Sequence, residues 1–349
     1  MEFDQLCKDY RPFKIKFDSY LEGKEFSSLV IIADIKVAQL FPRFKYNFEA
    51  GVPVHYYLVN VDERKKNIEE VKEIWDLMFR EQVDKNALII NWGGGMVSDL
   101  GGFAASTYKR GVSYINVPTT LLAMIDASVG GKTAINFNGI KNGIGTIYLP
   151  DEVFVDPVFL TTLEYSDILN GFGELIKYAL IHDIPLWTQL RSLPEINYDN
   201  MEPEWFGSAL EFKNNIVKRD LYDMGERRIL NFGHTVGHAL EGNSLSGQMP
   251  LNHGHAVALG ICCEAYISYL HRFISLETAK EIKEVIIRFY TLPSLSGEDR
   301  RSISELLKSD KKNSGNKINI TLLKKIGEAI PNQITTTGEV EESLDFLYA

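Results

Sequence analysis

Short strand-like runs that alternate with helical patterns limit the possible folds of the first half of this chain. Four of these runs are apolar and rich in β-branched residues, at 28–33, 54–59, 87–91 and 113–117. Between the second and third, residues 67–80 carry apolar side chains at helical spacing on one face. Strands that alternate with helices predict an α/β layer around a parallel sheet, and we expect its last strand at 153–156.

The sequence changes character near residue 163, because helical patterns dominate from there on. Five helices and one late strand are expected, at 167–181, 201–222, 231–242, 256–273, 277–289 and 317–323. A chain of 349 residues is long enough for two domains. We therefore predict an α/β domain over 1–163 and a mostly α-helical domain over 164–349.

Charge and cysteine content exclude several classes of protein. Lys and Arg number 37 against 47 Asp and Glu, so the net charge is −10, which disfavours a nucleic-acid partner. An anionic substrate must then be bound by local cations. The three cysteines show no CxxC spacing, which argues against a disulfide framework or a cysteine zinc site and fits the reducing cytoplasm. The N-terminal residues lack the apolar segment of a signal peptide, so we do not expect secretion. No apolar stretch reaches about 18 residues, so we do not expect a membrane partner.

Glycine is concentrated in residues 93–145, which hold 11 of the 27 glycines. Gly93, Gly94 and Gly95 follow a predicted strand and open a helix. Bare N–H groups at a helix N-terminus favour a phosphate or pyrophosphate ligand, although a tight turn without a ligand has the same sequence. The motif is neither GxGxxG nor a P-loop.

A second glycine-rich segment follows the strand at 113–117. Thr119 and Thr120 offer hydroxyl groups to a ribose or phosphate. The run from Gly130 to Thr133 superficially resembles the end of a P-loop, but Asp126 occupies the position of the first P-loop glycine, which disfavours an NTPase. Arg110, Lys132 and Lys141 would bring positive charge to this region.

Four of the seven histidines lie within residues 234–255. His234 and His238 are spaced i, i+4 on one face of a predicted helix, and His253 and His255 lie in a loop that enters the next helix. Glu174, between small residues on an earlier helix, is the candidate carboxylate. Two or three imidazoles and a carboxylate suit a divalent metal, whereas each histidine alone could be an ordinary core or surface residue. Thr235 breaks the HExxH pattern of zincin proteases.

A charged run precedes the histidines and includes Lys213, Arg219, Asp220, Asp223, Arg227 and Arg228. It is either a solvated helix face with ion pairs or an anion-binding surface, and the sequence leaves both open. Asp310-Lys311-Lys312-Asn313 could likewise be a plain surface turn.

Six ordered blocks between residues 88 and 260 together resemble the 3-dehydroquinate synthase family. The blocks are GGGMVSDLGGFAASTYKRG, INVPTTLLAMIDASVGGKTAIN, IKNGIGTIYLP, GFGELIKYALI, LNFGHTVGHALE and HGHAVALG. The resemblance implies a Rossmann-like N-terminal domain, a helical C-terminal domain and a homodimer with the site in the cleft. It also implies NAD, one divalent metal (Zn or Co), and conversion of the sugar phosphate 3-deoxy-D-arabino-heptulosonate 7-phosphate to 3-dehydroquinate and phosphate.

The resemblance assigns roles residue by residue. Glu174, His234 and His253 resemble the metal ligands, and His238 resembles the acid/base near the leaving phosphate. The substrate set comprises His238, Arg110, Asp126, Lys132, Asn142, Lys177, Lys213, Arg227, Asn231 and, in the 310–313 turn, Lys311. Within it, Lys132, Lys177, Arg227 and Asn231 join His238 as expected catalytic residues. The NAD contacts are Asp34, Glu63, Lys66, Gly94, Gly95, Asp99, Thr119, Thr120, Lys141, Phe159 and Thr162.

Two departures from the family pattern keep alternatives open. His255 stands where the family usually has Glu, and Asp223 stands where Glu is common. The HGH block is similar to that of cyclases acting on sedoheptulose 7-phosphate, which need no carboxylate-binding group. Arg227, Asn231 and the lysines of the 310–313 turn favour a substrate with a carboxylate. A metal-dependent alcohol or glycerol dehydrogenase would also fit the ligand set, and an inactive nucleotide-binding subunit fits it poorly.

Overall fold

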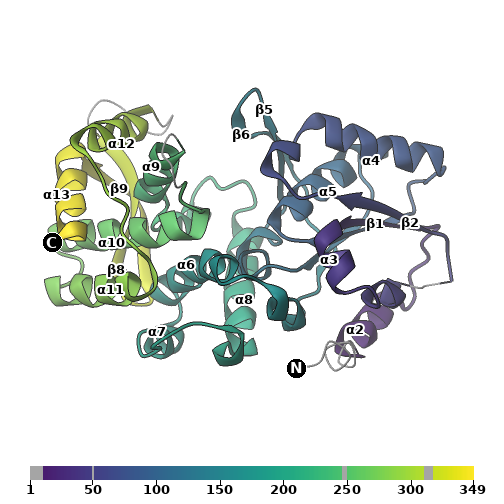
Figure 1. Cartoon of the computed structure of the whole chain (residues 1–349), viewed down its shortest axis with the longest axis horizontal. Helices are drawn as coiled ribbons and strands as arrows, with labels where there is room; N and C mark the ends of the chain where they lie inside the picture. The colour runs from purple at the N-terminus through teal and green to yellow at the C-terminus, as the bar shows by residue number, and fades with distance from the viewer. Residues whose placement is uncertain (1–10, 49–50, 246–249, 310–316) are drawn as a thin grey trace. The chain divides into compact units, whose positions relative to one another are not determined.

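The computed structural model describes residues 11–48, 51–245, 250–309 and 317–349. The chain divides into two compact units, Met1–Glu164 and Tyr165–Ala349 (Figure 1). The first unit is α/β and the second is mostly helical, so the predicted fold class is confirmed. Among the described residues, no helix combines the length and the hydropathy needed to cross a bilayer.

A five-stranded parallel sheet forms the centre of the first unit, with strand order β2-β1-β3-β4-β7. Its strands are β1 (Leu29–Asp34), β2 (Val54–Val59), β3 (Leu88–Gly93), β4 (Tyr114–Pro118) and β7 (Glu152–Val153). Every residue of β3 and β4 is buried. This is why these strands read as continuous apolar runs: a parallel sheet covered on both faces has no polar side.

Two different cores cover the faces of this sheet. On one side lie α4 (Ile68–Arg80) and α5 (Gly95–Thr107), which contribute aliphatic residues such as Val71, Ile74 and Leu100. The other core is aromatic: Phe44 stacks on Trp92 at 5.0 Å and meets Phe159 edge-on at 4.9 Å. The helices α2 (Arg11–Leu21) and α3 (Ile35–Leu40) complete the described helices of the unit.

A β-hairpin that we did not predict, β5 (Lys132–Phe137) and β6 (Ile140–Ile147), begins at the end of the second glycine-rich segment. Its turn residues Asn138 and Gly139 have φ of 48° and 77°, the conformation that Asn-Gly favours in two-residue hairpins. This dipeptide was the available signal. The expected strand at 153–156 was too long and one residue late, because β7 ends at Val153.

The second unit is built around α10 (His253–Leu270), which is buried along most of its length. Packed against it are α6 (Tyr165–Ile181), α9 (His234–Ser244), α11 (Leu276–Phe289) and α13 (Thr337–Tyr348). The remaining helices are α7 (Ile184–Leu190), α8 (Pro203–Arg219) and α12 (Gly297–Ser309). The strands β8 (Lys317–Lys325) and β9 (Glu328–Thr336) form an antiparallel hairpin.

Several predicted boundaries in this unit were wrong for local reasons. The helix expected from residue 231 begins at His234, because Gly233 adopts φ of 82° and separates it from a 3₁₀ turn at Glu226–Asn231. The helix expected from residue 256 begins at His253, where the Asn252 side chain accepts a hydrogen bond from the His255 N–H and caps it. The elements α7, α12, β9 and α13 were missed.

Candidate active site

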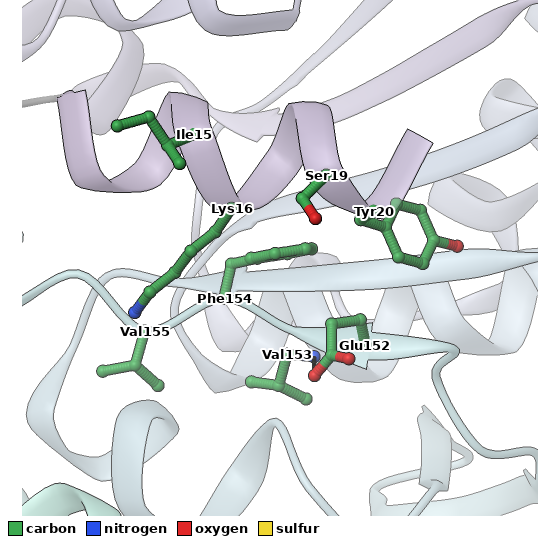
Figure 2. A pocket seen from close by; sticks show the side chains of 8 residues that line it. All are labelled: Ile15, Lys16, Ser19, Tyr20, Glu152, Val153, Phe154 and Val155. Atoms are coloured by element: carbon green, nitrogen blue, oxygen red, sulfur yellow. Dashed lines mark hydrogen bonds between the residues drawn. The ribbon is translucent and has the colours of Figure 1, made fainter. Parts of the chain in front are cut away.

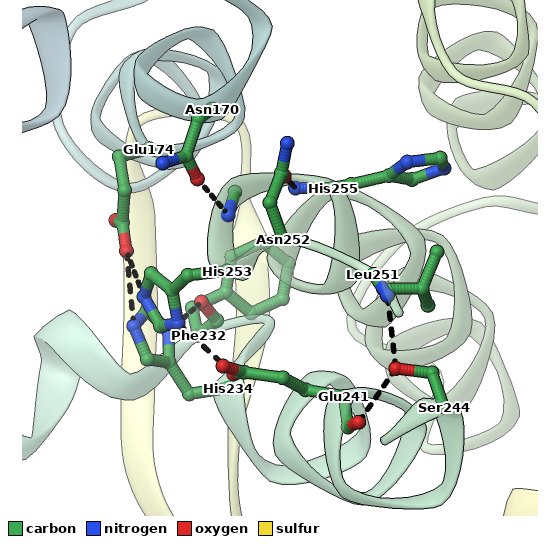
Figure 3. Close-up of polar contacts among 11 residues, drawn as sticks. Asn170, Glu174, Phe232, His234, Glu241, Ser244, Leu251, Asn252, His253 and His255 are labelled. Carbon is green, nitrogen blue, oxygen red and sulfur yellow. Dashed lines mark hydrogen bonds and ion pairs between the residues drawn. The ribbon is translucent and has the colours of Figure 1, made fainter. Parts of the chain in front are cut away.

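Three helices of the second unit bring one carboxylate and two imidazoles together. Glu174 lies on α6, His234 is the first residue of α9, and His253 is the first residue of α10. The Nε2 atoms of both histidines lie 3.1 Å from the same oxygen, Glu174 Oε1 (Figure 3). Residues up to 79 positions apart therefore converge at one point.

The geometry of this cluster fits a divalent metal ion. Ligand atoms about 2.0–2.1 Å from a tetrahedral zinc lie about 3.3 Å from one another, close to the Oε1–Nε2 separations seen here. His238 adds a third imidazole, since His234, His238 and His253 have nitrogen atoms within 4.8 Å of one another. The residue types and spacing leave a position open for a substrate oxygen or for His238.

Hydrogen bonds to the far side of each imidazole orient the two histidines. His234 Nδ1 lies 3.2 Å from the carbonyl oxygen of Phe232, and His253 Nδ1 lies 3.2 Å from Glu241 Oε2. Partners of this kind fix the ring orientation and leave Nε2 for the metal. Glu241 is the last residue of the block LNFGHTVGHALE, and the sequence predicted no role for it.

Lys177 neutralises the buried carboxylate of the cluster. Its Nζ lies 2.5 Å from Glu174 Oε2, and both side chains are essentially inaccessible. Burial alone would raise the pKa of Glu174, but the charges of Lys177 and His234 hold it well below its ordinary range. Burial opposes protonation of His253, yet hydrogen bonds to Glu174 and Glu241 raise its pKa to about 9. Metal binding therefore has to displace this proton.

The three helices that carry the ligands touch main chain to main chain at glycines. A Cβ on Gly173 would lie 2.1 Å from the Gly254 carbonyl oxygen, and one on Gly254 would lie 1.8 Å from that of Asn170. A Cβ on Gly260 would lie 2.0 Å from the Gly233 carbonyl oxygen. Each ligand is the immediate neighbour of one of these glycines in sequence. The close approach of the helices is thus what brings Glu174, His234 and His253 within reach of one ion.

A pocket of about 80 Å³ adjoins the cluster. His234 and His238 line it together with Asn231, and Arg228, Thr235, Asn319, Ile320 and Thr321 complete its wall. Asn231 is thus placed beside two histidines, as expected of a substrate contact. Arg228 donates from Nη1 to Asn332 Oδ1 at 2.8 Å, which fixes its guanidinium on β9.

The charged run before the histidines is partly a solvated face with an ion pair and partly buried. Arg219 forms an exposed two-bond ion pair with Glu226. Lys213 and Arg227 are buried, and Arg227 Nη1 donates to the Leu221 carbonyl at 2.9 Å. The carboxylate of Asp220 accepts main-chain N–H groups of Met224, Gly225 and Arg227 and so shapes the turn.

His255 lies apart from the cluster of Glu174, His234 and His253. Its Nε2 is 2.7 Å from the Thr291 carbonyl oxygen, and its ring turns away from Glu174 and His234 (Figure 3). The residue that supports His253 is Glu241 instead. The side chain of His255 therefore bonds to the main chain at Thr291 rather than to a candidate ligand.

In the first unit, the glycine turn is closely packed and leaves the N-terminus of α5 without a side-chain cap. Gly94 precedes the first residue of α5 and contributes no side-chain cap. A Cβ on Gly94 or Gly95 would lie 3.0 Å from a neighbouring side chain, that of Thr120 or Ala127. The hydroxyl of Thr119 is buried without a hydrogen-bond partner. Bare amides and a spare hydroxyl suit a dinucleotide phosphate.

The charged residues among the other predicted NAD contacts each have partners within the protein. Lys66 is buried, pairs with Asp99 at 2.6 Å and also bonds Asn142. Glu63 Oε1 accepts from Asn136 at 2.8 Å, while Asp34 caps α3. Burial raises the pKa of Asp34 despite the opposing N–H groups of Lys36 and Val37.

The ring of Phe159 is in the aromatic core, so only its main chain could meet a ligand. Thr162 donates to the Phe159 carbonyl at 3.3 Å, and Lys141 lies on exposed β6.

The remaining predicted substrate contacts of this unit lie on different segments of the chain. Lys132 is exposed at the start of β5, and Asp126 lies in a short π-helical turn at Ala123–Ala127. Arg110 is exposed and adopts φ of 65°. Lys311 lies outside the described residues.

A hollow of about 560 Å³ between α2 and residues 152–155 holds none of the predicted site residues (Figure 2). Its charged side chains are Lys16 and Glu152, beside the aromatic rings of Tyr20 and Phe154. This lining offers no set of metal ligands and no glycine-rich main chain, so we assign it no role.

Comparison with known proteins relates both units to one family. A family model described as 3-dehydroquinate synthase N-terminal matches residues 56–170, and one described as 3-dehydroquinate synthase C-terminal matches residues 171–313. The 3-dehydroquinate synthase of Parabacteroides distasonis is 38% identical over 344 residues, which cover 98% of this chain and 96% of that protein.

Solved structures agree with this relationship. The 2-epi-5-epi-valiolone synthase ValA of Streptomyces hygroscopicus, solved with NAD⁺ and Zn²⁺ bound, superposes with a TM-score of 0.79 at 27% identity, over 93% of this chain and 91% of that one. A 2-deoxy-scyllo-inosose synthase complexed with carbaglucose-6-phosphate, NAD⁺ and Co²⁺ gives a TM-score of 0.80 at 23% identity, over 95% and 93%. At that identity the second likeness concerns the fold.

The helix contacts at glycine yield a first prediction. Gly260→Ala places a methyl group against the main chain of α9, so we expect a loss of about 1–3 kcal/mol in the free energy of unfolding. Separation of α9 from α10 should also weaken metal binding, as measured by competition with a chelator. Gly207→Ala, on an exposed face of α8 with no atom within 4 Å, is the control and should stabilise by up to about 1 kcal/mol. Equal stability and metal affinity in the two variants would contradict the packing argument.

Proposed function

Because the chain belongs to the 3-dehydroquinate synthase family, we propose that it converts 3-deoxy-D-arabino-heptulosonate 7-phosphate to 3-dehydroquinate and phosphate. This reaction belongs to the shikimate pathway, which leads to the aromatic amino acids. The observation that carries the proposal is the convergence of Glu174, His234 and His253, from three helices, on a point that suits one divalent ion. Residues 1–163 are proposed to bind NAD, and residues 164–349 to bind the metal and much of the substrate.

The proposed roles follow from the chemistry of the reaction. When bound, NAD takes up and returns a hydride while the divalent ion, Zn²⁺ or Co²⁺, polarises substrate oxygens. Glu174, His234 and His253 would hold the ion, and the glycine turn with Thr119 and Thr120 would hold the dinucleotide. Elimination of phosphate and intramolecular aldol closure then depend on correct positioning and on neutralised charge.

Residues of this chain would supply that positioning. Lys177 keeps the buried Glu174 ionised and is proposed to contact the substrate beside it. Arg227, Lys213 and Asn231 are proposed to bind the substrate in the second unit, where two of them are buried cations. Arg110, Asp126, Lys132 and Asn142 are proposed to bind it from the first unit. His238, whose ring lies next to those of His234 and His253, is proposed to exchange a proton with the substrate.

We propose that the enzyme works as a homodimer in the cytoplasm. The edge strand β6 exposes Ile140, Ile144 and Ile147, by 64%, 41% and 37%, and Phe137 at the end of β5 is 43% exposed. Apolar side chains along a strand edge favour association with another chain, here a second copy. Cys262 and Cys263 are unpaired and buried, which fits a reducing compartment.

The test of the reaction is phosphate release with two substrates in parallel. We expect phosphate and 3-dehydroquinate, identified by mass, from 3-deoxy-D-arabino-heptulosonate 7-phosphate, and at least tenfold less phosphate from sedoheptulose 7-phosphate. Absorption at 340 nm should stay flat, because the hydride returns to the product. Preference for sedoheptulose 7-phosphate would favour the other cyclase class, and steady accumulation of NADH would favour a dehydrogenase.

Removal of the metal tests the ligand set. Chelation should abolish phosphate release, and Zn²⁺ or Co²⁺ should restore it. His234→Ala should lose the ion as well as activity, whereas Lys132→Ala should bind the ion normally and lose turnover, because Lys132 belongs to the other unit. Metal content by mass spectrometry separates the two. Full activity without metal, or equal metal loss in both variants, would refute these assignments.

The dimer is tested by light scattering after size exclusion. Wild type should have twice the chain mass of 39.6 kDa. Ile144→Lys puts a charge on the exposed strand and should give single chains. The control is Ile287→Lys on α11, where the isoleucine is 42% exposed, and it should remain dimeric. A monomeric wild type, or a dimeric Ile144→Lys variant, would contradict the proposed interface.

A further inference from the structure

One buried carboxylate next to the metal cluster has no part in the roles proposed above. Glu264 lies on α10, eleven residues after His253, and is completely buried. Its Oε2 accepts a hydrogen bond from the Gly233 N–H at 2.6 Å, and its Oε1 accepts one from the Val236 N–H at 3.0 Å. The Thr235 N–H points to the same carboxylate. All three donors belong to the start of α9.

These bonds provide a cap that α9 cannot supply itself. The first N–H groups of a helix lack partners within the helix, and a side chain at the N-cap normally satisfies one of them. Here the N-cap is Gly233, which has no side chain, and its φ of 82° is one that glycine adopts readily. Glu264 therefore caps α9 from a different helix, and the positive end of α9 favours the ionised form of its carboxyl group.

The cost of burying this group argues that its position matters. A carboxylate removed from water loses several kcal/mol of hydration unless hydrogen bonds replace it. Burial raises the pKa of Glu264 to about 8, although the N–H groups of Val236, Gly233 and Thr235 act against this. An apolar side chain would fill the space without that cost, but it would leave the first turn of α9 uncapped.

The capped turn contains a metal ligand. His234 directly follows Gly233, and His253 starts the helix to which Glu264 belongs. Glu264 therefore ties the turn that carries one candidate ligand to the helix that carries another. A Cβ on Gly233 would lie 2.5 Å from Ile261 Cγ1, so the same turn already touches α10 closely. The hydrogen bonds from Gly233 and Val236 to Glu264 also fix the orientation of this turn on α10, which close packing alone would not do.

We infer that Glu264 is a positioning residue of the metal centre, which fixes His234 relative to His253 by holding the first turn of α9 on α10. The inference rests on the proposed metal ligands. It concerns how tightly and in what geometry the ion is held, not a step of the reaction.

The experiment compares Glu264→Gln with a control on the same helix. Gln keeps the size but offers one acceptor and turns an amide group toward main-chain N–H donors. The control is Ser268→Ala, one turn further along α10, which is equally buried. It loses a hydrogen bond to the Glu264 carbonyl at 2.6 Å and one from the Leu323 N–H at 2.9 Å, so its bonds run to α10 and β8 rather than to α9. Glu264→Asp, which keeps the charge on a shorter side chain, serves if the Gln variant does not fold.

The measurement is titration of chelator-stripped protein with Co²⁺, followed by its visible absorption and by chelator competition. Loss of a group that orients a metal ligand typically weakens metal affinity about 10–100-fold, and we expect that loss together with a changed Co²⁺ spectrum in Glu264→Gln. Glu264→Asp should lie between it and wild type. Ser268→Ala should lower the melting temperature and leave affinity and spectrum unchanged.

The outcomes separate this inference from the proposed function. If the Glu264 variants only lower the melting temperature, with Co²⁺ affinity and spectrum as in wild type, Glu264 is merely structural and the inference is overturned. A wild type that binds no Co²⁺ overturns the metal centre and the inference together. If wild type binds Co²⁺ but releases no phosphate, the proposed reaction fails, and the inference is still decided by the spectra.

Discussion

Contact between helix main chains at glycine is the constraint on which the candidate site depends. Side chains normally hold packed helices about 8–10 Å apart, and glycine removes that separation. At Gly173, Gly254 and Gly260 a single methyl group would collide with a carbonyl oxygen of the next helix. Because each candidate ligand is the sequence neighbour of a glycine in these contacts, the main chain determines where Glu174, His234 and His253 lie. Glutamate and histidine side chains then need little freedom to meet, which reduces the entropy lost when an ion binds.

The sequence predicted the parts of this structure that depend on local pattern. The central strands are continuous apolar runs because both faces of the sheet are covered, and α4 has an obvious apolar face. The β5–β6 hairpin was not predicted, because β6 contains two glycines and does not alternate between apolar and polar residues. The sequence signal for it was the turn dipeptide Asn138-Gly139. In the site, residue type and spacing indicated Glu174 and a group of four histidines, and the family resemblance selected His234 and His253 among them. Glu241 and Glu264 could not be found in this way, because their partners lie on other helices and include main-chain N–H groups without a sequence signature.

Electrostatics explains how an acidic chain can hold an anionic substrate. The net charge of −10 repels anions at a distance, and screening limits that repulsion to about 8–10 Å at physiological salt. Inside the second unit the balance is different, since Lys177, Lys213 and Arg227 are all buried. Lys177 has its charge balanced by Glu174, so the ion pair carries no net charge until a metal ion adds its own. The positive potential of the candidate site, to which the buried Lys213 and Arg227 also contribute, would therefore rise when an ion binds beside Glu174.

Two helices of this chain start after a glycine and differ in what occupies their N-terminus. At α5 the N-cap is Gly94, and at α9 it is Gly233, and neither provides a side-chain cap. The amides at α9 receive the internal carboxylate of Glu264, so that end of the helix is already neutralised and serves to fix a metal ligand. The turn before α5 lies beside the unpartnered hydroxyl of Thr119 instead. The N-terminus of α9 thus receives a side chain of the protein, and the N-terminus of α5 is proposed to receive a phosphate of the dinucleotide. In this chain a glycine before a helix therefore indicates a ligand only where no side chain of the protein already occupies that N-terminus.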